Sequence, residues 1–258
     1  MRDVLYGERY LIEPGRCLRH DKLRKFVVET LPYYDYEQTL TFYTAVAPKM
    51  TIEEQAFLGC NDRFFLLTTL LGRRDAMHPW VFSRCREVED APDGHLDLWA
   101  RFHYKSTVGT FAGIIQEIMR DPEITVCILS CTQDIASAFL LQIQQEFERN
   151  ERLKSTYPDV LWEEPSREAS RWSRAKGIVV KRNTNPKEGT VEAYGLIDGQ
   201  PTSRHYKLLV FEDVVTQDRA AARADETPGS AEAAWDAGDI SHGEYKARER
   251  ADLIRTRK

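Results

Sequence analysis

Two short segments carry the residue types that phosphate chemistry requires. Residues 96–107 read LDLWARFHYKST, an apolar run followed by a basic loop that ends in Lys-Ser-Thr. Residues 208–215 read LLVFEDVV, a second apolar run that ends in two adjacent acids. A lysine and a hydroxyl at a helix start, with acids at the tip of a buried strand, are the groups that bind a nucleoside triphosphate and its magnesium ion. The two segments together predict a P-loop type ATPase site.

The first segment would supply the phosphate-binding loop. We expect Lys105 to neutralise the β and γ phosphates and the hydroxyl of Ser106 to ligate Mg2+. Thr107 would lie in the first helical turn, and Arg101 would add a second cation whose planar fork suits phosphate. The predicted ATP-contacting residues are Arg101, Phe102, His103, Tyr104, Lys105, Ser106 and Thr107.

This loop departs from the standard pattern Gly-x4-Gly-Lys-Ser/Thr. Trp99 and Tyr104 occupy the two glycine positions. Glycines normally let backbone amides close around phosphate oxygens. The alternative interpretation is therefore a strand followed by an ordinary helix start, with Lys105 exposed to solvent.

The second segment would supply the acids. We expect Glu212 to hold Mg2+ through its coordinated water, and Asp213 to polarise the attacking water as a general base. The predicted catalytic residues are thus Asp213, Lys105 and Arg101, and the predicted metal-binding residues are Ser106 and Glu212. The alternative is a strand end with two solvated acids.

Three further groups of polar and aromatic residues have both functional and structural interpretations. Thr132 ends the run Ser-Cys-Thr and would either sense the γ phosphate or cap the next helix, the interpretation that we favour. An aromatic and arginine set before the loop would either contact adenine or pack; it comprises Trp80, Phe82, Arg84 and Arg86. A basic set would either touch DNA phosphates or, as we favour, line a solvated sheet edge; it comprises Lys176, Lys181, Arg182, Lys187, Arg204 and Lys207.

Hydrophobic periodicity indicates the elements that position these residues. Residues 21–72 are expected to be helical, with a capping box formed by Thr51 and Glu54. Later helices are expected at residues 80–88, 105–120 and 133–150, and strands at residues 95–100, 124–130, 178–182, 191–196 and 206–211. Strands that alternate with helices predict an α/β, P-loop NTPase-like three-layer fold with a mostly parallel central sheet and a helical N-terminal extension.

Composition and charge indicate the domain organisation of the chain and the kinds of partner that it could bind. We expect an N-terminal arm and helical region at 1–75, an ATPase domain at 76–218 and a charged helical tail at 219–258. The net charge of −5 gives no global nucleic-acid signature, so a DNA contact would need a local basic patch. No apolar run approaches the length of a membrane span, and the N-terminus has no apolar core of a signal peptide, which favours a cytoplasmic location, the host cytoplasm if the resemblance described below holds. The five cysteines show no Cys-x-x-Cys spacing and are expected to be reduced and structural.

Several motifs in order resemble the ATPase half of a phage terminase large subunit. They are NDRFFLLT at 61–68, RCREVE at 84–89, DLWARFHYKST at 97–107, NPKE at 185–188, GQPTSR at 199–204 and the acids of 208–215. The resemblance covers about residues 50 to 217, and this branch of the family uses a variant loop of the Arg-x-His-Tyr-Lys-Ser type.

The resemblance implies an ATP- and Mg2+-dependent motor that packages double-stranded DNA into procapsids. It implies a portal protein and a small terminase subunit as partners, and an assembled homo-oligomer. It carries over Arg101, Lys105 and Ser106 as phosphate and Mg2+ contacts, and Glu212 and Asp213 as the acidic pair. Because the resemblance stops near Asp218, nuclease activity is not expected.

Two other functions stay open on the sequence. The chain would instead be a nucleotide- or DNA-binding remnant of a prophage terminase that no longer hydrolyses ATP, or a degraded fragment with an unrelated tail. Hydrolysis stimulated by DNA favours the motor, and nucleotide binding without turnover favours the remnant.

Overall fold

A computed structural model gives the fold of the chain. The chain divides into two compact units, Met1–Glu212 and Asp213–Lys258, and the second is described only at residues 213 and 214. The expected arm, the expected tail and Arg101 lie outside the described residues. The described residues are 23–27, 29–91, 94–100, 102–197 and 201–214.

The first part of the described chain is helical, as the sequence predicts. Its elements are η2 (Leu31–Tyr33), α2 (Tyr36–Ala45), η3 (Ala47–Lys49), α3 (Ile52–Asn61), α4 (Arg63–Phe65), the π-helical η4 (Leu66–Leu70), η5 (Arg74–Ala76) and α5 (Pro79–Asp90). The predicted capping box is confirmed: the Glu54 amide donates to the Thr51 hydroxyl at 3.2 Å, and the Thr51 amide donates to the Glu54 carboxylate at 2.8 Å.

The second part contains both helices and strands, and its last four elements are strands. Its elements are the π-helical η6 (Thr107–Ala112), α6 (Gly113–Arg120), β1 (Val126–Ser130), α7 (Gln133–Arg149), α8 (Glu151–Thr156), α9 (Pro165–Glu168), β2 (Trp172–Ser173), β3 (Gly177–Ile178), β4 (Val191–Gly195) and β5 (Leu208–Phe211). The predicted helices at 105–120 and 133–150 are therefore confirmed, as are the strands that became β1, β4 and β5.

The described strands form one open five-stranded sheet in the order β2-β3-β4-β1-β5. The prediction of a mostly parallel sheet is wrong, because the sheet is mixed. β1 runs parallel to β4 and to β5, whereas β3 runs antiparallel to both β2 and β4. The physical reason is the length of the connections. Neighbouring strands joined by a short turn, as β2 and β3 are, must run antiparallel, and only a long crossover such as the one from β1 to β4 allows parallel pairing.

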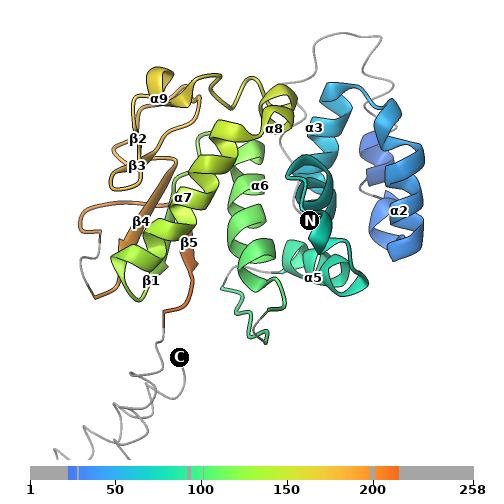
Figure 1. Ribbon diagram of the computed structural model, residues 1–258, viewed down its shortest axis with the longest axis horizontal. Helices are drawn as coiled ribbons and strands as arrows, with labels where there is room; N and C mark the ends of the chain where they lie inside the picture. Colours follow the sequence, from blue (N-terminus) through green and yellow to red (C-terminus); the bar gives the residue numbers. More distant parts are fainter. Residues whose placement is uncertain (1–22, 28, 92–93, 101, 198–200, 215–258) are drawn as a thin grey trace, which may run out of the picture. The chain divides into compact units, whose positions relative to one another are not determined.

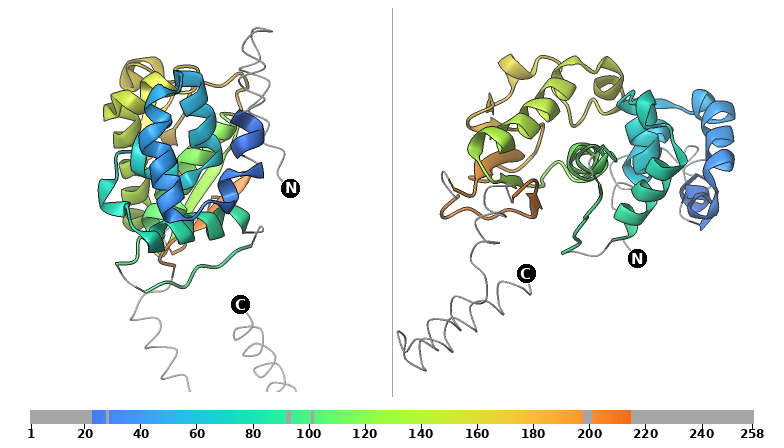
Figure 2. Two further views of the ribbon diagram at one scale, coloured as in Figure 1. Left: turned by 90° about the vertical axis from the view of Figure 1, so that its right-hand side faces the viewer. Right: turned by 60° about the horizontal axis from the view of Figure 1, so that its bottom comes forward.

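Helix α7 covers one face of the sheet and packs on β1 and β4 (Figure 1). Helix α6 lies between the sheet and the N-terminal helices, and it packs on α3 (Figure 1 and Figure 2). One hydrophobic core joins these layers. It contains Phe64, Leu58, Ile115, Ile118, Val126, Ile128, Leu140, Ile143 and Phe147, all fully buried.

The predicted strand at 95–100 is absent from the structure. These residues form neither strand nor helix, and the side chains of Leu96 and Leu98 are 73% and 84% exposed. Strand β5 consequently lies at the end of the described sheet, and Leu209 and Phe211 on one of its faces are exposed. Residues 95–100 pair with none of the described strands, so apolar content alone did not identify a strand.

A buried ionic network joins the N-terminal helices to α6. The guanidinium Nε of Arg63 donates to Gln116 at 2.9 Å, and the amide of Gln116 donates to Glu89 at 2.9 Å. The same Glu89 oxygen accepts the backbone N–H of Arg63 at 2.8 Å and lies 3.7 Å from Arg120. Every buried polar group in this chain of contacts therefore has a partner, which a buried charge requires.

Gly59 allows the closest approach within this helical layer. A Cβ at Gly59 would lie 2.4 Å from the hydroxyl of Tyr157 and 2.7 Å from Leu70. Tyr157 cannot easily withdraw, because it is fully buried and its hydroxyl donates to the Ala56 carbonyl at 2.9 Å. Helix α3 therefore accepts glycine here despite its poor helix propensity.

We expect Gly59→Ala to destabilise the protein by about 1–3 kcal/mol, the usual cost of overpacking a core. The matched control is Gly109→Ala in η6, where an added Cβ meets nothing within 4 Å. That control should be neutral or should stabilise by up to about 1 kcal/mol, because alanine favours helical backbone. Chemical denaturation measures both changes. Equal stability of the two variants would contradict the close packing at Gly59.

Candidate functional site

The structure brings together the two segments that the sequence singled out. The Nζ of Lys105 lies 3.2 Å from Oε1 of Glu212. The hydroxyl of Ser106 donates to the same oxygen at 2.6 Å. Ser106 and Glu212 are 106 residues apart in the chain. The predicted pairing of a lysine and a hydroxyl with an acid at the end of a strand is therefore present, although the strand expected before the loop is not.

Backbone contacts fix both sides of the site. The N–H of Glu212 donates to the Leu129 carbonyl at 2.9 Å, which extends the β1–β5 ladder to the acid. On the other side, the N–H of Val108 donates to the Tyr104 carbonyl at 2.8 Å and starts the helix that carries Ser106. Glu212 is only 4% exposed. Its carboxylate therefore lies buried at the end of β5, against the start of the helix that carries Ser106.

Thr110 is a site residue that the sequence analysis missed. Its hydroxyl donates to Oε2 of Glu212 at 2.5 Å, and the residue is 2% exposed. The signal was present in the sequence, because Thr110 follows Ser106 by four positions and residues at that spacing share a helix face. The predicted contact residue Thr107 opens the π-helical η6, a type of segment that is frequent at functional sites.

The loop before Lys105 has a backbone that usually requires glycine. Tyr104, which occupies a glycine position of the standard loop, has φ 62°, and Phe102 has φ 65°. Left-handed backbone costs a residue with a Cβ about 1 kcal/mol or more. The hydroxyl of Tyr104 donates to the Asp75 carbonyl at 3.0 Å and anchors the loop, whereas the Phe102 side chain is 97% exposed. The backbone thus adopts the left-handed conformation that usually requires glycine at two positions that are not glycine.

Aromatic rings and a cation gather beside this loop. The guanidinium of Arg84 lies 4.8 Å from the ring centre of Trp80 and 6.0 Å from that of Trp99. His103 packs edge-on against Trp80 at 5.6 Å. The other two residues of the predicted adenine set have structural surroundings, since Phe82 is buried and Arg86 pairs with the buried Asp62 at 3.2 Å.

The second predicted acid is in the second unit. Asp213 follows Glu212 directly, is exposed and has φ 47°. A left-handed residue turns the chain immediately after β5. Its predicted role as general base rests on the sequence.

The predicted basic set is largely occupied by the protein's own acceptors. Arg204 pairs with the buried Glu192 at 3.0 Å, and Lys207 pairs with Asp121 at 3.2 Å. The ammonium of Lys187 donates to the Ser203 carbonyl at 2.9 Å. These contacts favour the structural interpretation over a DNA-binding patch.

Two smaller sequence predictions have clear outcomes. Thr132 is the N-cap residue of α7, but its side chain accepts no capping hydrogen bond. The described cysteines, Cys60, Cys85, Cys127 and Cys131, are free and buried, while Cys17 lies outside the described residues. Burial raises the pKa of the Cys60 and Cys127 thiols to about 12, which makes them inert at neutral pH.

The site offers oxygen ligands, which suit Mg2+ better than the soft metals. One carboxylate and two hydroxyls converge, and Mg2+ commonly binds through one carboxylate together with water and substrate phosphates. Within the described ranges, no group of three His, Cys, Asp or Glu side chains is placed to hold a metal ion alone. None of the described helices is long and apolar enough to cross a membrane.

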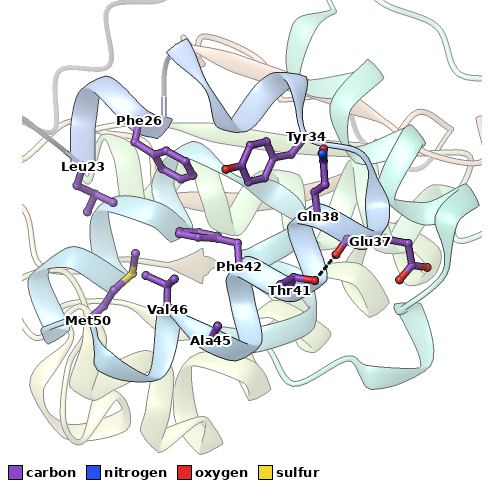
Figure 3. A pocket seen from close by; sticks show the side chains of 10 residues that line it. All are labelled: Leu23, Phe26, Tyr34, Glu37, Gln38, Thr41, Phe42, Ala45, Val46 and Met50. Atoms are coloured by element: carbon purple, nitrogen blue, oxygen red, sulfur yellow. Dashed lines mark hydrogen bonds between the residues drawn. The ribbon is translucent and has the colours of Figure 1, made fainter.

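A groove of about 750 Å³ lies elsewhere in the first unit, along α2 (Figure 3). Apolar side chains such as Phe26, Phe42 and Met50 line it, and none of the residues of the Lys105–Glu212 site takes part. Its lining carries one acid, Glu37, and no cation. It therefore lacks the groups that phosphate binding needs.

Comparisons with known protein families, with curated proteins and with solved structures found no match to this chain.

Proposed function

We propose that this chain is a P-loop type ATPase, with a P-loop NTPase-like three-layer fold, that acts in a DNA-packaging motor of the terminase large-subunit type. The observation that carries the proposal is the convergence of Lys105 and Ser106 on Glu212, at 3.2 and 2.6 Å. An acid at a strand end, a hydroxyl and a lysine at a helix start are the parts that such enzymes need to hold Mg2+ and phosphate. The parallel pairing of β1 with β4 and β5 also supports it, since ligands of such sheets bind beyond the carboxyl ends of parallel strands.

In this proposal each side chain has a separate task. Lys105 binds the β and γ phosphates, Ser106 and Glu212 hold the magnesium ion that ATP brings, and Asp213 orients and deprotonates the attacking water. Arg101 adds a cation to the phosphates. The resemblance, rather than the geometry, supports double-stranded DNA, a portal protein, a small terminase subunit and further copies of the chain as partners.

One observation favours a second candidate, a nucleotide-binding module that does not hydrolyse ATP. The strand expected at 95–100 does not form, and a phosphate loop held by only one flanking element is less rigid. Catalysis depends on preorganised charges more strongly than binding does. Binding without turnover would follow if the loop lacks that order.

The deciding experiment is steady-state Mg-ATP hydrolysis with and without double-stranded DNA, beside Lys105→Ala. The control variant is Lys49→Ala, because Lys49 lies in η3, outside the site. Turnover that Lys105→Ala abolishes and Lys49→Ala preserves supports the ATPase, and stimulation by DNA supports the motor. A folded protein that binds ATP without turnover would instead support the binding module.

A further inference from the structure

We propose that Thr110 is a positioning residue of this site, whose hydroxyl holds the Glu212 carboxylate in the orientation that receives Mg2+. This inference rests on the proposed nucleotide function. It concerns a residue outside the phosphate loop and outside the acidic pair. Its basis is the way in which the two oxygens of one carboxylate are shared among three donors.

The two carboxylate oxygens have different kinds of partner. Oε1 of Glu212 accepts the Ser106 hydroxyl at 2.6 Å and pairs with the Lys105 ammonium at 3.2 Å. Oε2 accepts only the Thr110 hydroxyl among the hydrogen bonds of the described residues, at 2.5 Å. Lys105 and Ser106 are the groups that a phosphate and a metal ion recruit. The partners of Oε1 must therefore change when a nucleotide binds, and the partner of Oε2 has no reason to leave.

The donors on the Oε1 side and on the Oε2 side of the carboxylate also differ in their exposure to solvent. The Lys105 side chain is 33% exposed, whereas Thr110 is 2% exposed. A hydroxyl has a single hydrogen, and that of Thr110 is committed to Glu212. The Oε1 side is thus the accessible side, and the Oε2 contact is an interior anchor.

A glutamate needs such an anchor because its last torsion is loose. The terminal sp3–sp2 torsion of a carboxylate has broad minima, so the backbone contact of Glu212 with Leu129 does not fix the plane of the carboxylate. Thr110 supplies that constraint from η6, the same helical segment that begins next to Ser106. The same helical segment then holds both the Ser106 hydroxyl and the residue that orients the Glu212 carboxylate. Fixed relative positions of this kind suit Mg2+, which requires near-octahedral geometry.

The test compares Thr110→Val, which keeps the shape and removes the hydroxyl, with Thr110→Ser, which keeps the hydroxyl. ADP affinity is measured by calorimetry in Mg2+ and in EDTA. We expect Thr110→Val to lose about tenfold or more of the gain in affinity that Mg2+ gives, as for one hydrogen bond to a charged group. Its affinity in EDTA should stay within about twofold of the wild type, and Thr110→Ser should restore the gain.

Thr156→Val is the matched control. Thr156 is also buried and helical, but its hydroxyl donates to the Arg152 carbonyl at 2.7 Å in α8, outside the site. This variant should keep the full effect of Mg2+. If Thr110→Val does not fold, Thr110→Ala removes the same hydroxyl without the bulk of valine.

Each outcome bears on one of the two proposals. An unchanged effect of Mg2+ in Thr110→Val, or a Thr110→Ser variant that behaves like it, would overturn the positioning role. A wild-type protein that binds Mg-ADP but does not hydrolyse ATP would overturn the ATPase proposal and leave this test intact. A wild-type protein that binds no ADP in either condition would overturn both.

Discussion

Replacing Glu212 by glutamine should abolish Mg-ATP hydrolysis while leaving the protein folded. We expect kcat to fall by about 10²–10³-fold, the usual loss when one preorganised electrostatic partner is removed. The amide keeps the size of the side chain and can still accept from Ser106 or Thr110, whose hydroxyls lie 2.6 and 2.5 Å from the carboxylate. It cannot supply the negative charge that balances Mg2+. The loss should therefore appear in kcat, and ATP affinity in EDTA should not fall, because the neutral amide leaves no uncompensated charge when a phosphate takes the Lys105 ammonium.

Steady-state kinetics with thermal unfolding of the same samples provides the measurement. The matched control is Glu163→Gln, because Glu163 is an exposed acid in the loop after α8. That variant should hydrolyse ATP at the wild-type rate. If Glu212→Gln kept more than about a tenth of the activity, the acid would not be the metal-holding residue.

Replacing Arg63 by methionine should destabilise the first unit by about 1–3 kcal/mol, the typical cost of leaving a buried polar group without its hydrogen-bond partner. Arg63 is 5% exposed, and its side chain donates to Gln116. Its backbone N–H, which methionine keeps, donates to Glu89. Methionine fills part of the volume, but it leaves the Gln116 carbonyl without its donor and removes one of the two cations that lower the pKa of Glu89 most, while Arg120 stays 3.7 Å away. The control is Arg167→Met, which removes an exposed ion pair with Glu164 and should cost less than about 1 kcal/mol.

The effect of Arg63→Met should also depend on pH. Burial raises the pKa of Glu89, and Arg63 is the strongest of the opposing influences, so its removal should raise that pKa further. An acid whose pKa is higher in the folded than in the unfolded state loses stability as the pH rises above the unfolded value of about 4.3. The loss of stability should therefore be greater at pH 8 than at pH 5. Denaturant unfolding at the two pH values measures it, and an equal loss at both would contradict a charged Glu89 in the network.

The helices were predictable because their signals are local. Thr51 and Glu54 form the capping box that their spacing indicates, and the apolar spacing of 133–150 became α7. The site was predictable in part for a similar reason, since a helix start and a strand end each carry a short motif. Lys105, Ser106 and Glu212 converge as expected, although no local pattern could show that they would touch.

The incorrect or missing predictions concern segments whose structure depends on contacts with another segment of the chain. A strand needs a partner, and residues 95–100 have the apolar content of a strand without the pairing. The direction of β3 depends on its short connection to β2, so alternation of helices and strands did not reveal a mixed sheet. Thr110 was overlooked because its four-residue spacing from Ser106 indicates only a shared helix face, and its role depends on the contact with Glu212, which is distant in the sequence.

In the proposed site, the ion pair between Lys105 and Glu212 would make phosphate and metal binding mutually dependent. When a phosphate takes the ammonium, the carboxylate, 5% exposed, is left without its cation, and an uncompensated buried charge is costly. Mg2+ bound at the proposed site would restore that balance, so each ligand should strengthen the binding of the other by the same factor, as linkage requires. Inorganic phosphate or metal-free nucleotide should accordingly bind weakly, and the site would respond to the complex of nucleotide and metal as a single ligand.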